Sequence, residues 1–141
     1  MPRAYAQQVC DLFGQLGTRG VSILAASGDA GPGQSCQSNN GSEAVRFLPA
    51  FPASCPWVTA VGATEGNSPG VAAKLSGGGF SEYFARPAYQ YDAVEAYLEK
   101  HGKEWEGYYN RSGRAFPDVA ALGKNYQIFN HDVIESADGT R

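Results

Sequence analysis

The chain of 141 residues lacks the features that mark several large protein classes. Basic residues are not in excess: 11 Lys and Arg stand against 14 Asp and Glu, for a formal net charge of -3, which argues against a nucleic-acid partner. No apolar run approaches the roughly 20 residues of a membrane span, so we expect no membrane association. The start, MPRAYAQQVC, has no apolar h-region, so we expect no signal peptide in this chain.

Metal-ligating residues are also scarce. The three cysteines form no CxxC pair, and His101 and His131 lie far apart, which argues against a zinc site. Cys10 lies among apolar residues of a predicted helix, so we expect it to be a buried free thiol. The triple glycine at 77–79 has no Lys-Ser/Thr after it, so a nucleotide-binding loop is not expected.

The composition supports one globular domain, since 43% of the residues are apolar and 12% are aromatic. Apolar residues at helical spacing predict an amphipathic helix over 4–16 that ends at Gly17. The runs GVSILAA (20–26) and WVTAVGAT (57–64) are typical of buried strands. The apolar face of the helix is expected to consist of Tyr5, Val9, Leu12 and Leu16, with Phe13 beside it. A helix, a short turn and a buried strand in this order favour a parallel α/β sheet.

The second half of the chain is less regular. We expect a glycine-rich, aromatic loop over 75–90, a helix over 93–101, and a turn-rich segment over 107–123. The runs YQIFN (126–130) and DVIES (132–136) predict a hairpin that turns at Asn130 and His131.

Asp29 is the first candidate for chemistry. It lies just past the end of the strand predicted over 20–26, between glycines, in the stretch SGDAG. Ligands of α/β sheets bind where strands end at their carboxyl edge, and glycine lets a backbone approach a ligand closely. The other interpretation is that Asp29 caps a following turn or helix, which aspartate often does.

Five stretches resemble a known family when they are taken together. They are GVSILAASGDAGPG, FPAFPASCPWVTAVGAT, SGGGFSEYFARPAYQ, YYNRSGRAFPDVAALGKNYQIF and the final DGT, in this order. The chain is similar, from about Cys10 to Thr140, to the sedolisin family of serine-carboxyl peptidases, and most of all to its fungal tripeptidyl-peptidase branch. The resemblance implies an α/β fold like that of the subtilisins, with a parallel sheet flanked by helices.

In this family the aspartate of the SGD motif donates a hydrogen bond in the oxyanion hole, a role that falls here on Asp29. A tetrahedral intermediate carries a negative oxygen, and an aspartate can donate to it only when protonated. A free aspartic acid has a pKa of about 3.9, so an enzyme that uses it favours acid conditions unless burial raises that value. We expect the backbone of Ser27 and Gly28 to form a wall of the substrate's specificity pocket.

The rest of the family's Ser-Glu-Asp triad has no counterpart in the chain. The glutamate and aspartate lie upstream of SGD in the family, and here Asp11 alone precedes Asp29, on a predicted helix, where we interpret it as a solvent-facing acid. Arg141 stands where the family motif Gly-Thr-Ser has its nucleophile. The family's calcium site is expected outside these residues as well. We therefore expect residues 1–141 to form a partial peptidase domain that is inactive in isolation and that aggregates through exposed apolar strands.

Several other residues have two interpretations. Cys36 and Cys55 form a disulfide if the protein is secreted, worth about 3 kcal/mol, or else stay separate thiols or pair outside the chain. The sequons at Asn40 and Asn110 are glycosylation candidates under the same condition. Asp118 is interpreted as a structural acid that satisfies backbone donors. The aromatic residues pack in the core, or Trp57, Trp105 and the tyrosines of GYYN form a sugar-binding platform.

The sequence hypothesis is therefore a segment of an extracellular, acid-acting serine-carboxyl peptidase, an endopeptidase or a tripeptidyl-peptidase. Its partner is a peptide or protein substrate, and the full-length form is expected to be a monomer. Two alternatives stay open at this point: a non-catalytic remnant of such an enzyme, and a small aromatic-rich binding module unrelated to proteolysis.

Overall fold

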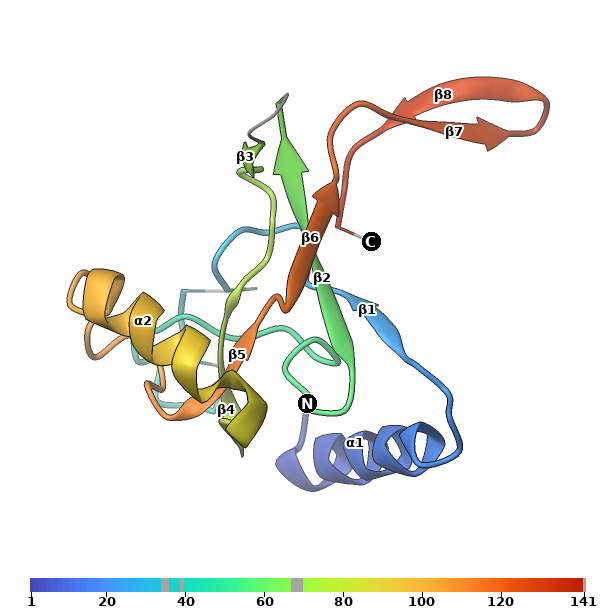
Figure 1. The fold of residues 1–141 in the computed structure, drawn as a ribbon. Helices are drawn as coiled ribbons and strands as arrows, with labels where there is room; N and C mark the ends of the chain where they lie inside the picture. Colours follow the sequence, from blue (N-terminus) through green and yellow to red (C-terminus); the bar gives the residue numbers. More distant parts are fainter. Residues whose placement is uncertain (34–35, 39, 67–69, 141) are drawn as a thin grey trace.

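The structure is a computed structural model that describes residues 1–33, 36–38, 40–66 and 70–140. Within them the chain has a mixed α/β fold (Figure 1). The elements, in chain order, are α1 (Arg3–Gly17), β1 (Leu24–Ala26), β2 (Thr59–Glu65), β3 (Val71–Ala72), β4 (Gly79–Ala85), the 3-10 helix η1 (Ala88–Gln90), α2 (Tyr91–His101), β5 (Gly113–Phe116), β6 (Val119–Leu122), β7 (Tyr126–Asn130) and β8 (Val133–Ala137).

A small sheet with three parallel strands lies at the centre. Strand β2 pairs in parallel with β1 on one side and with β6 on the other, and β3 pairs antiparallel with the end of β2. The register places Ala25 opposite Ala60 and Val61 opposite Val119. The predicted parallel α/β sheet is confirmed for these strands. Strand β2 is buried along most of its length, as its run of small apolar residues predicts.

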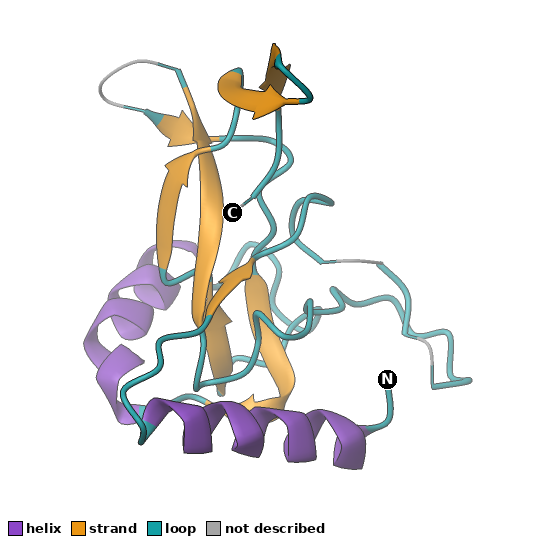
Figure 2. Ribbon diagram, turned by 90° about the vertical axis from the view of Figure 1, so that its right-hand side faces the viewer, coloured by secondary structure: helices purple, strands orange, loops and turns teal. Residues whose placement is uncertain are grey.

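Two antiparallel ladders complete the architecture. Strand β4 pairs with β5, and β7 pairs with β8 in the predicted hairpin, which projects away from the central sheet in both views (Figures 1 and 2). The hairpin turns one residue later than predicted, at His131 and Asp132, whose φ angles of 45° and 64° are left-handed. The loop predicted over 75–90 and the turns predicted over 107–123 are wrong in part, because they contain β4, β5 and β6.

Helix α1 lies across one end of the sheet (Figure 2) and confirms the predicted helix over 4–16. Its packed face differs from the prediction. Ala6 and Cys10 are buried, whereas Tyr5 and Leu12 are exposed. The half-buried Phe13 also packs against the core around Cys10 and Ala25. The ring of Trp57 lies against Gly14, where an added β-carbon would be 3.2 Å from it.

A disulfide joins α1 to the segment before β2. It links Cys10 to Cys55, with the two Cα atoms 5.7 Å apart, within the range that a disulfide spans. The predicted pairing of Cys36 with Cys55 is therefore wrong, and so is the free thiol predicted at Cys10. Cys36 is exposed and free. The tertiary packing of α1 brings Cys10 to the core around Cys55 and Val58. This packing decides which cysteines form the disulfide.

Much apolar surface stays uncovered. Ala25 is the one buried residue of β1, and Leu24 beside it is exposed. The prediction of a buried strand is therefore correct only in part. Strand β6 is exposed along its whole length, and Phe129 of the hairpin is 73% exposed. The predicted aggregation of the isolated chain stays a prediction, with these strands as its physical cause. Within the described residues, neither helix is long and apolar enough to cross a membrane.

Candidate active site

Asp29 lies where β1 ends, at the carboxyl edge of the parallel strands. The ladder continues for one residue past β1, because the Ser27 N–H donates to the Val61 carbonyl over 2.9 Å. The chain then leaves the sheet at Gly28, whose φ of 109° is accessible to glycine and strained for other residues. The sequence therefore places the exposed Asp29 at a sharp exit from the sheet.

The triple glycine lies directly against this exit. The Gly77 N–H donates to the Gly28 carbonyl over 2.6 Å. A β-carbon on residue 77 would be 2.2 Å from the Ser27 carbonyl oxygen, far inside van der Waals contact. The backbone of 77 therefore approaches the backbone of 27–28 as only glycine allows, which gives the glycine run a structural role.

Thr140 approaches Asp29 from the other side. Its backbone N–H and its hydroxyl both lie within hydrogen-bond distance of the same Asp29 oxygen, Oδ1, at 2.6 Å and 2.9 Å. The Gly28 N–H in turn donates to the Thr140 hydroxyl oxygen over 3.1 Å. Thr140 is 3% exposed. Two segments that are 111 residues apart in the sequence therefore meet at one carboxyl group.

The second oxygen of Asp29 is left without such partners. Among the described residues, none forms a hydrogen bond with Oδ2. Gly139 lies close to this oxygen, since a β-carbon added to it would be 3.3 Å from Oδ2. Gly139 is itself held by a 2.8 Å hydrogen bond from its N–H to the Gly123 carbonyl. The arrangement presents one anchored and one available carboxyl oxygen.

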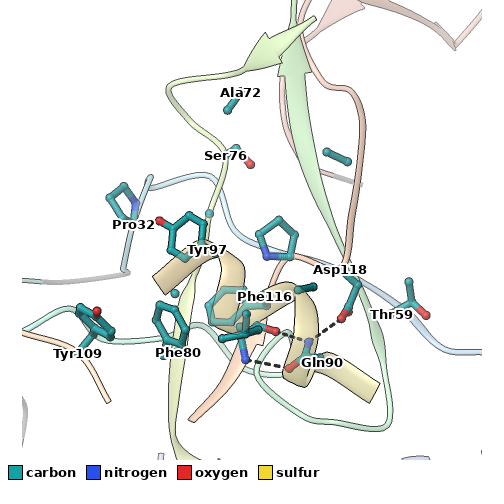
Figure 3. Close-up of a pocket in the computed structure, with 18 of the residues that line it drawn as sticks. Pro32, Thr59, Ala72, Ser76, Phe80, Gln90, Tyr97, Tyr109, Phe116 and Asp118 are labelled. Carbon is teal, nitrogen blue, oxygen red and sulfur yellow. Dashed lines mark hydrogen bonds between the residues drawn. The ribbon is translucent and has the colours of Figure 1, made fainter. Parts of the chain in front are cut away.

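A cavity of about 1010 Å³ lies beside the glycine run (Figure 3). Gly77 and Gly78 line it, and Gly77 also contacts the Asp29 segment. Aromatic rings form another part of its wall, with Phe80 stacked on Tyr109 at a centroid distance of 4.8 Å. Gln90 of η1 and Asp118 also line the cavity and are joined by a 3.1 Å hydrogen bond.

Comparison with known proteins agrees with this geometry. No family model matches the chain. Tripeptidyl-peptidase SED2 of Arthroderma otae is 50% identical over 140 residues, which is 99% of this chain and 24% of that protein. Probable tripeptidyl-peptidase SED3 of Trichophyton verrucosum is 49% identical over 140 residues, with the same coverage. Across nearly its whole length the chain is therefore homologous to a segment of tripeptidyl-peptidases of the sedolisin family. It spans about a quarter of the length of these curated relatives.

Two predicted residues of the sedolisin site, Ser27 and Gly28, lie beside Asp29. Ser27 is fully buried, and its hydroxyl has no hydrogen-bond partner among the residues that the structure describes. Gly28 is half-buried, with its N–H bonded to Thr140. Their role as a substrate wall stays a prediction. Arg141, at the position of the family's nucleophile, lies outside the described residues. The sequence analysis assigned no role to Thr140. Its position in the final DGT stretch was the one signal that could have identified it as a site residue.

Asp118 is the structural acid that the sequence predicts. Its carboxylate accepts a 2.7 Å hydrogen bond from the Ala60 N–H of β2 and another from Arg114, which is fully buried. Arg114 also donates to the Val58 carbonyl over 2.9 Å. Partial burial raises the pKa of the neighbouring Tyr89 hydroxyl, and the charge of Arg114 opposes that shift. This cluster holds β2, β5 and η1 together.

The two sequons differ in geometry. In each, the asparagine Oδ1 accepts hydrogen bonds from the backbone N–H and hydroxyl of the serine two residues on. Asn40 is exposed, and its side-chain nitrogen has no hydrogen-bond partner among the described residues. Asn110 is half-buried, and its side-chain nitrogen donates to the Ser81 carbonyl over 2.8 Å. Both stay predictions, with Asn40 the more accessible.

The described residues contain no cluster of three or more His, Cys, Asp or Glu side chains that could hold a metal ion. The calcium site that the resemblance to the sedolisins implies, outside this chain, stays a prediction.

Proposed function

We propose that this chain supplies the oxyanion-hole segment of a serine-carboxyl peptidase that cleaves peptide bonds under acid conditions. The observation that carries the proposal is the contact of Thr140 with Asp29. It brings the DGT stretch, which precedes the nucleophile in the family, against the aspartate of the SGD stretch. Both motifs thereby meet at the carboxyl edge of the parallel sheet, where α/β folds bind ligands.

The chemistry assigned to Asp29 is hydrogen-bond donation. Attack on a peptide carbonyl creates a negatively charged oxygen, and a protonated Asp29 donates to it through Oδ2, with which none of the described residues forms a hydrogen bond. Oδ1 keeps its bonds to Thr140 throughout. Protonation of a carboxylic acid requires acid conditions, which is the physical reason for proposing an acid-acting enzyme.

We further propose the subtilisin-like arrangement for the complete domain. Three parallel strands, an aspartate at their carboxyl edge and a helix across one end of the sheet support it. The exposed apolar residues of β1 and β6 support further cover from polypeptide outside residues 1–141. A calcium site, if the enzyme has one, lies among residues beyond those described.

For substrate and location, the proposal follows the relatives. Their names are tripeptidyl-peptidases, so we propose release of tripeptides from a peptide or protein by a secreted monomer. The Cys10–Cys55 disulfide supports an oxidising compartment. The isolated chain is proposed to be inactive, because it has arginine at position 141 and no upstream glutamate to act as general base.

Arg141 favours a second candidate, a non-catalytic relative that keeps the fold without the nucleophile. No comparable observation favours a sugar-binding module, since Phe47, Phe80, Trp105 and Tyr109 pack on one another or on neighbouring aromatic rings.

The experiment is to express the full-length product of the gene and incubate it with peptides at about pH 4, near the pKa of a carboxylic acid. Mass spectrometry of the products reads out the reaction. Release of successive tripeptides supports the proposal, and internal cleavage supports an endopeptidase. No cleavage by a folded product, judged by its cooperative thermal unfolding, supports the non-catalytic candidate.

A further inference from the structure

The geometry points to Thr140 as a positioning residue that fixes the orientation of the Asp29 carboxyl group, so that its protonated oxygen faces the substrate. This inference rests on the proposed function and adds a residue and a role to it.

The hydroxyl of Thr140 lies between two groups of the Asp29 segment. The Gly28 N–H can only donate, so it directs its hydrogen at the hydroxyl oxygen, 3.1 Å away. The hydroxyl hydrogen is then available for a second partner, and Asp29 Oδ1 lies 2.9 Å away. The result is a directed chain from the Gly28 N–H through the Thr140 hydroxyl to Oδ1.

Oδ1 also receives the backbone N–H of Thr140, at 2.6 Å. A carboxylate oxygen has about two lone-pair sites, so these two donors occupy both sites of Oδ1. A proton added to the carboxyl group therefore goes to Oδ2. The terminal torsion of an aspartate is broad, so without such anchors the carboxyl group takes a range of orientations and either oxygen can carry the proton.

The surroundings of Thr140 suit this role. Thr140 is almost fully buried, so water does not compete for its hydroxyl. Its neighbour Gly139 is fixed by the bond to Gly123 and leaves space beside Oδ2 that a side chain would reduce. Thr140 thus fixes the donor of the proposed oxyanion hole without touching the substrate itself.

The test uses the full-length gene product and compares Thr140→Val, which keeps the side-chain shape, with Thr140→Ser, which keeps the hydroxyl. Loss of positioning is expected to lower kcat about 10- to 100-fold in Thr140→Val and to leave KM within about 2-fold, because the interaction matters mainly in the transition state. Thr140→Ser is expected to stay within about 3-fold of the wild type in kcat. Thr18→Val, which removes an exposed hydroxyl at the C-terminal end of α1, is the matched control and keeps wild-type kinetics.

A double-mutant cycle separates positioning from a general structural effect. If Thr140 acts through Asp29, adding Thr140→Val to Asp29→Ala produces no further loss of kcat. An equal loss in both backgrounds, or wild-type kcat in Thr140→Val, overturns the inference while leaving the peptidase proposal in place. A wild-type protein without any peptidase activity overturns the proposed function first.

A crystal structure of the wild type and of Thr140→Val provides a readout that needs no activity. The inference expects one Asp29 carboxyl orientation in the wild type, with Oδ1 on residue 140, and a rotated or mixed orientation in the variant. The same single orientation in both proteins overturns it.

Discussion

Gly77 lies so close to Ser27 that a β-carbon at position 77 would be 2.2 Å from the Ser27 carbonyl oxygen. This contact holds the backbone of the Asp29 segment in place through the hydrogen bond from Gly77 to Gly28. The glycine run and the SGD stretch therefore form one structural unit, although they are about 50 residues apart in the sequence.

We expect Gly77→Ala to lower the free energy of unfolding by about 3 kcal/mol, because the overpacked backbone must move. Urea titration of the full-length gene product measures the change. Gly17→Ala is the matched control, since a β-carbon there meets no atom within 4 Å. Equal stability of the two variants would contradict the contact.

The Cys10–Cys55 disulfide closes a loop with a sequence separation of 45. Replacing both cysteines with alanine is expected to lower the free energy of unfolding by about 4 kcal/mol, because the unfolded chain gains the entropy of the open loop. Cys36→Ser, at an exposed free thiol, is expected to leave stability unchanged. Alkylation of the denatured, unreduced protein followed by peptide mapping checks the pairing, because denaturation exposes the buried Cys10 and Cys55. Among these three cysteines, label on Cys36 alone is expected, and label on Cys10 would show that the bond is absent.

Asp118 balances the charge of the fully buried Arg114, and its own side chain is 19% exposed. We expect Asp118→Ala to lower the free energy of unfolding by about 3 kcal/mol, since it leaves a buried cation unpaired. Glu82→Ala, which breaks the more exposed ion pair with Arg46, is expected to cost less than about 1 kcal/mol. Chemical denaturation of both variants tests this order, and a larger loss in Glu82→Ala would refute it.

The two sequons are expected to differ in occupancy when the protein is made in a secreting eukaryotic host. Asn40 is exposed. At Asn110, the side-chain nitrogen that would carry a glycan donates a hydrogen bond to the Ser81 carbonyl. Glycosidase treatment in heavy-oxygen water, followed by peptide mass spectrometry, is expected to mark Asn40 more completely than Asn110. The reverse order would show that the Asn110 contact does not limit glycosylation.

The helices and strands that were predicted correctly are those whose sequence signals lie within one short segment. The helix over 4–16, the strand within 57–64 and the hairpin of 126–130 with 132–136 are confirmed, because each has its apolar spacing or its turn within a few residues. Strands β4 and β5 were not predicted. Each begins with a glycine, which is typical of a loop, and the two strands pair with each other across about 30 residues. Pairing across that distance leaves little trace in either segment.

The site was predictable only in part, for a related reason. The position of Asp29 after an apolar strand identifies it as a candidate, and the resemblance to the sedolisins adds its proposed role. Thr140 contacts Asp29 across 111 residues, and the disulfide partner of Cys10 depends on how α1 packs. Neither relationship follows from spacing in the sequence, because both are set by the tertiary fold.

The central claim is that Asp29 donates a hydrogen bond to the substrate's oxyanion, and a comparison of Asp29→Asn with Asp29→Ala tests it most directly. In Asp29→Asn, the amide oxygen takes the two bonds from Thr140, so the NH₂ group replaces Oδ2 and can still donate.

The measurement is kcat for tripeptide release at about pH 4 by the full-length gene product. We predict that Asp29→Ala lowers kcat about 100- to 1,000-fold at nearly constant KM, and that Asp29→Asn stays within about 10-fold of the wild type. Wild-type kcat in Asp29→Ala, or equal losses in both variants, would contradict the account.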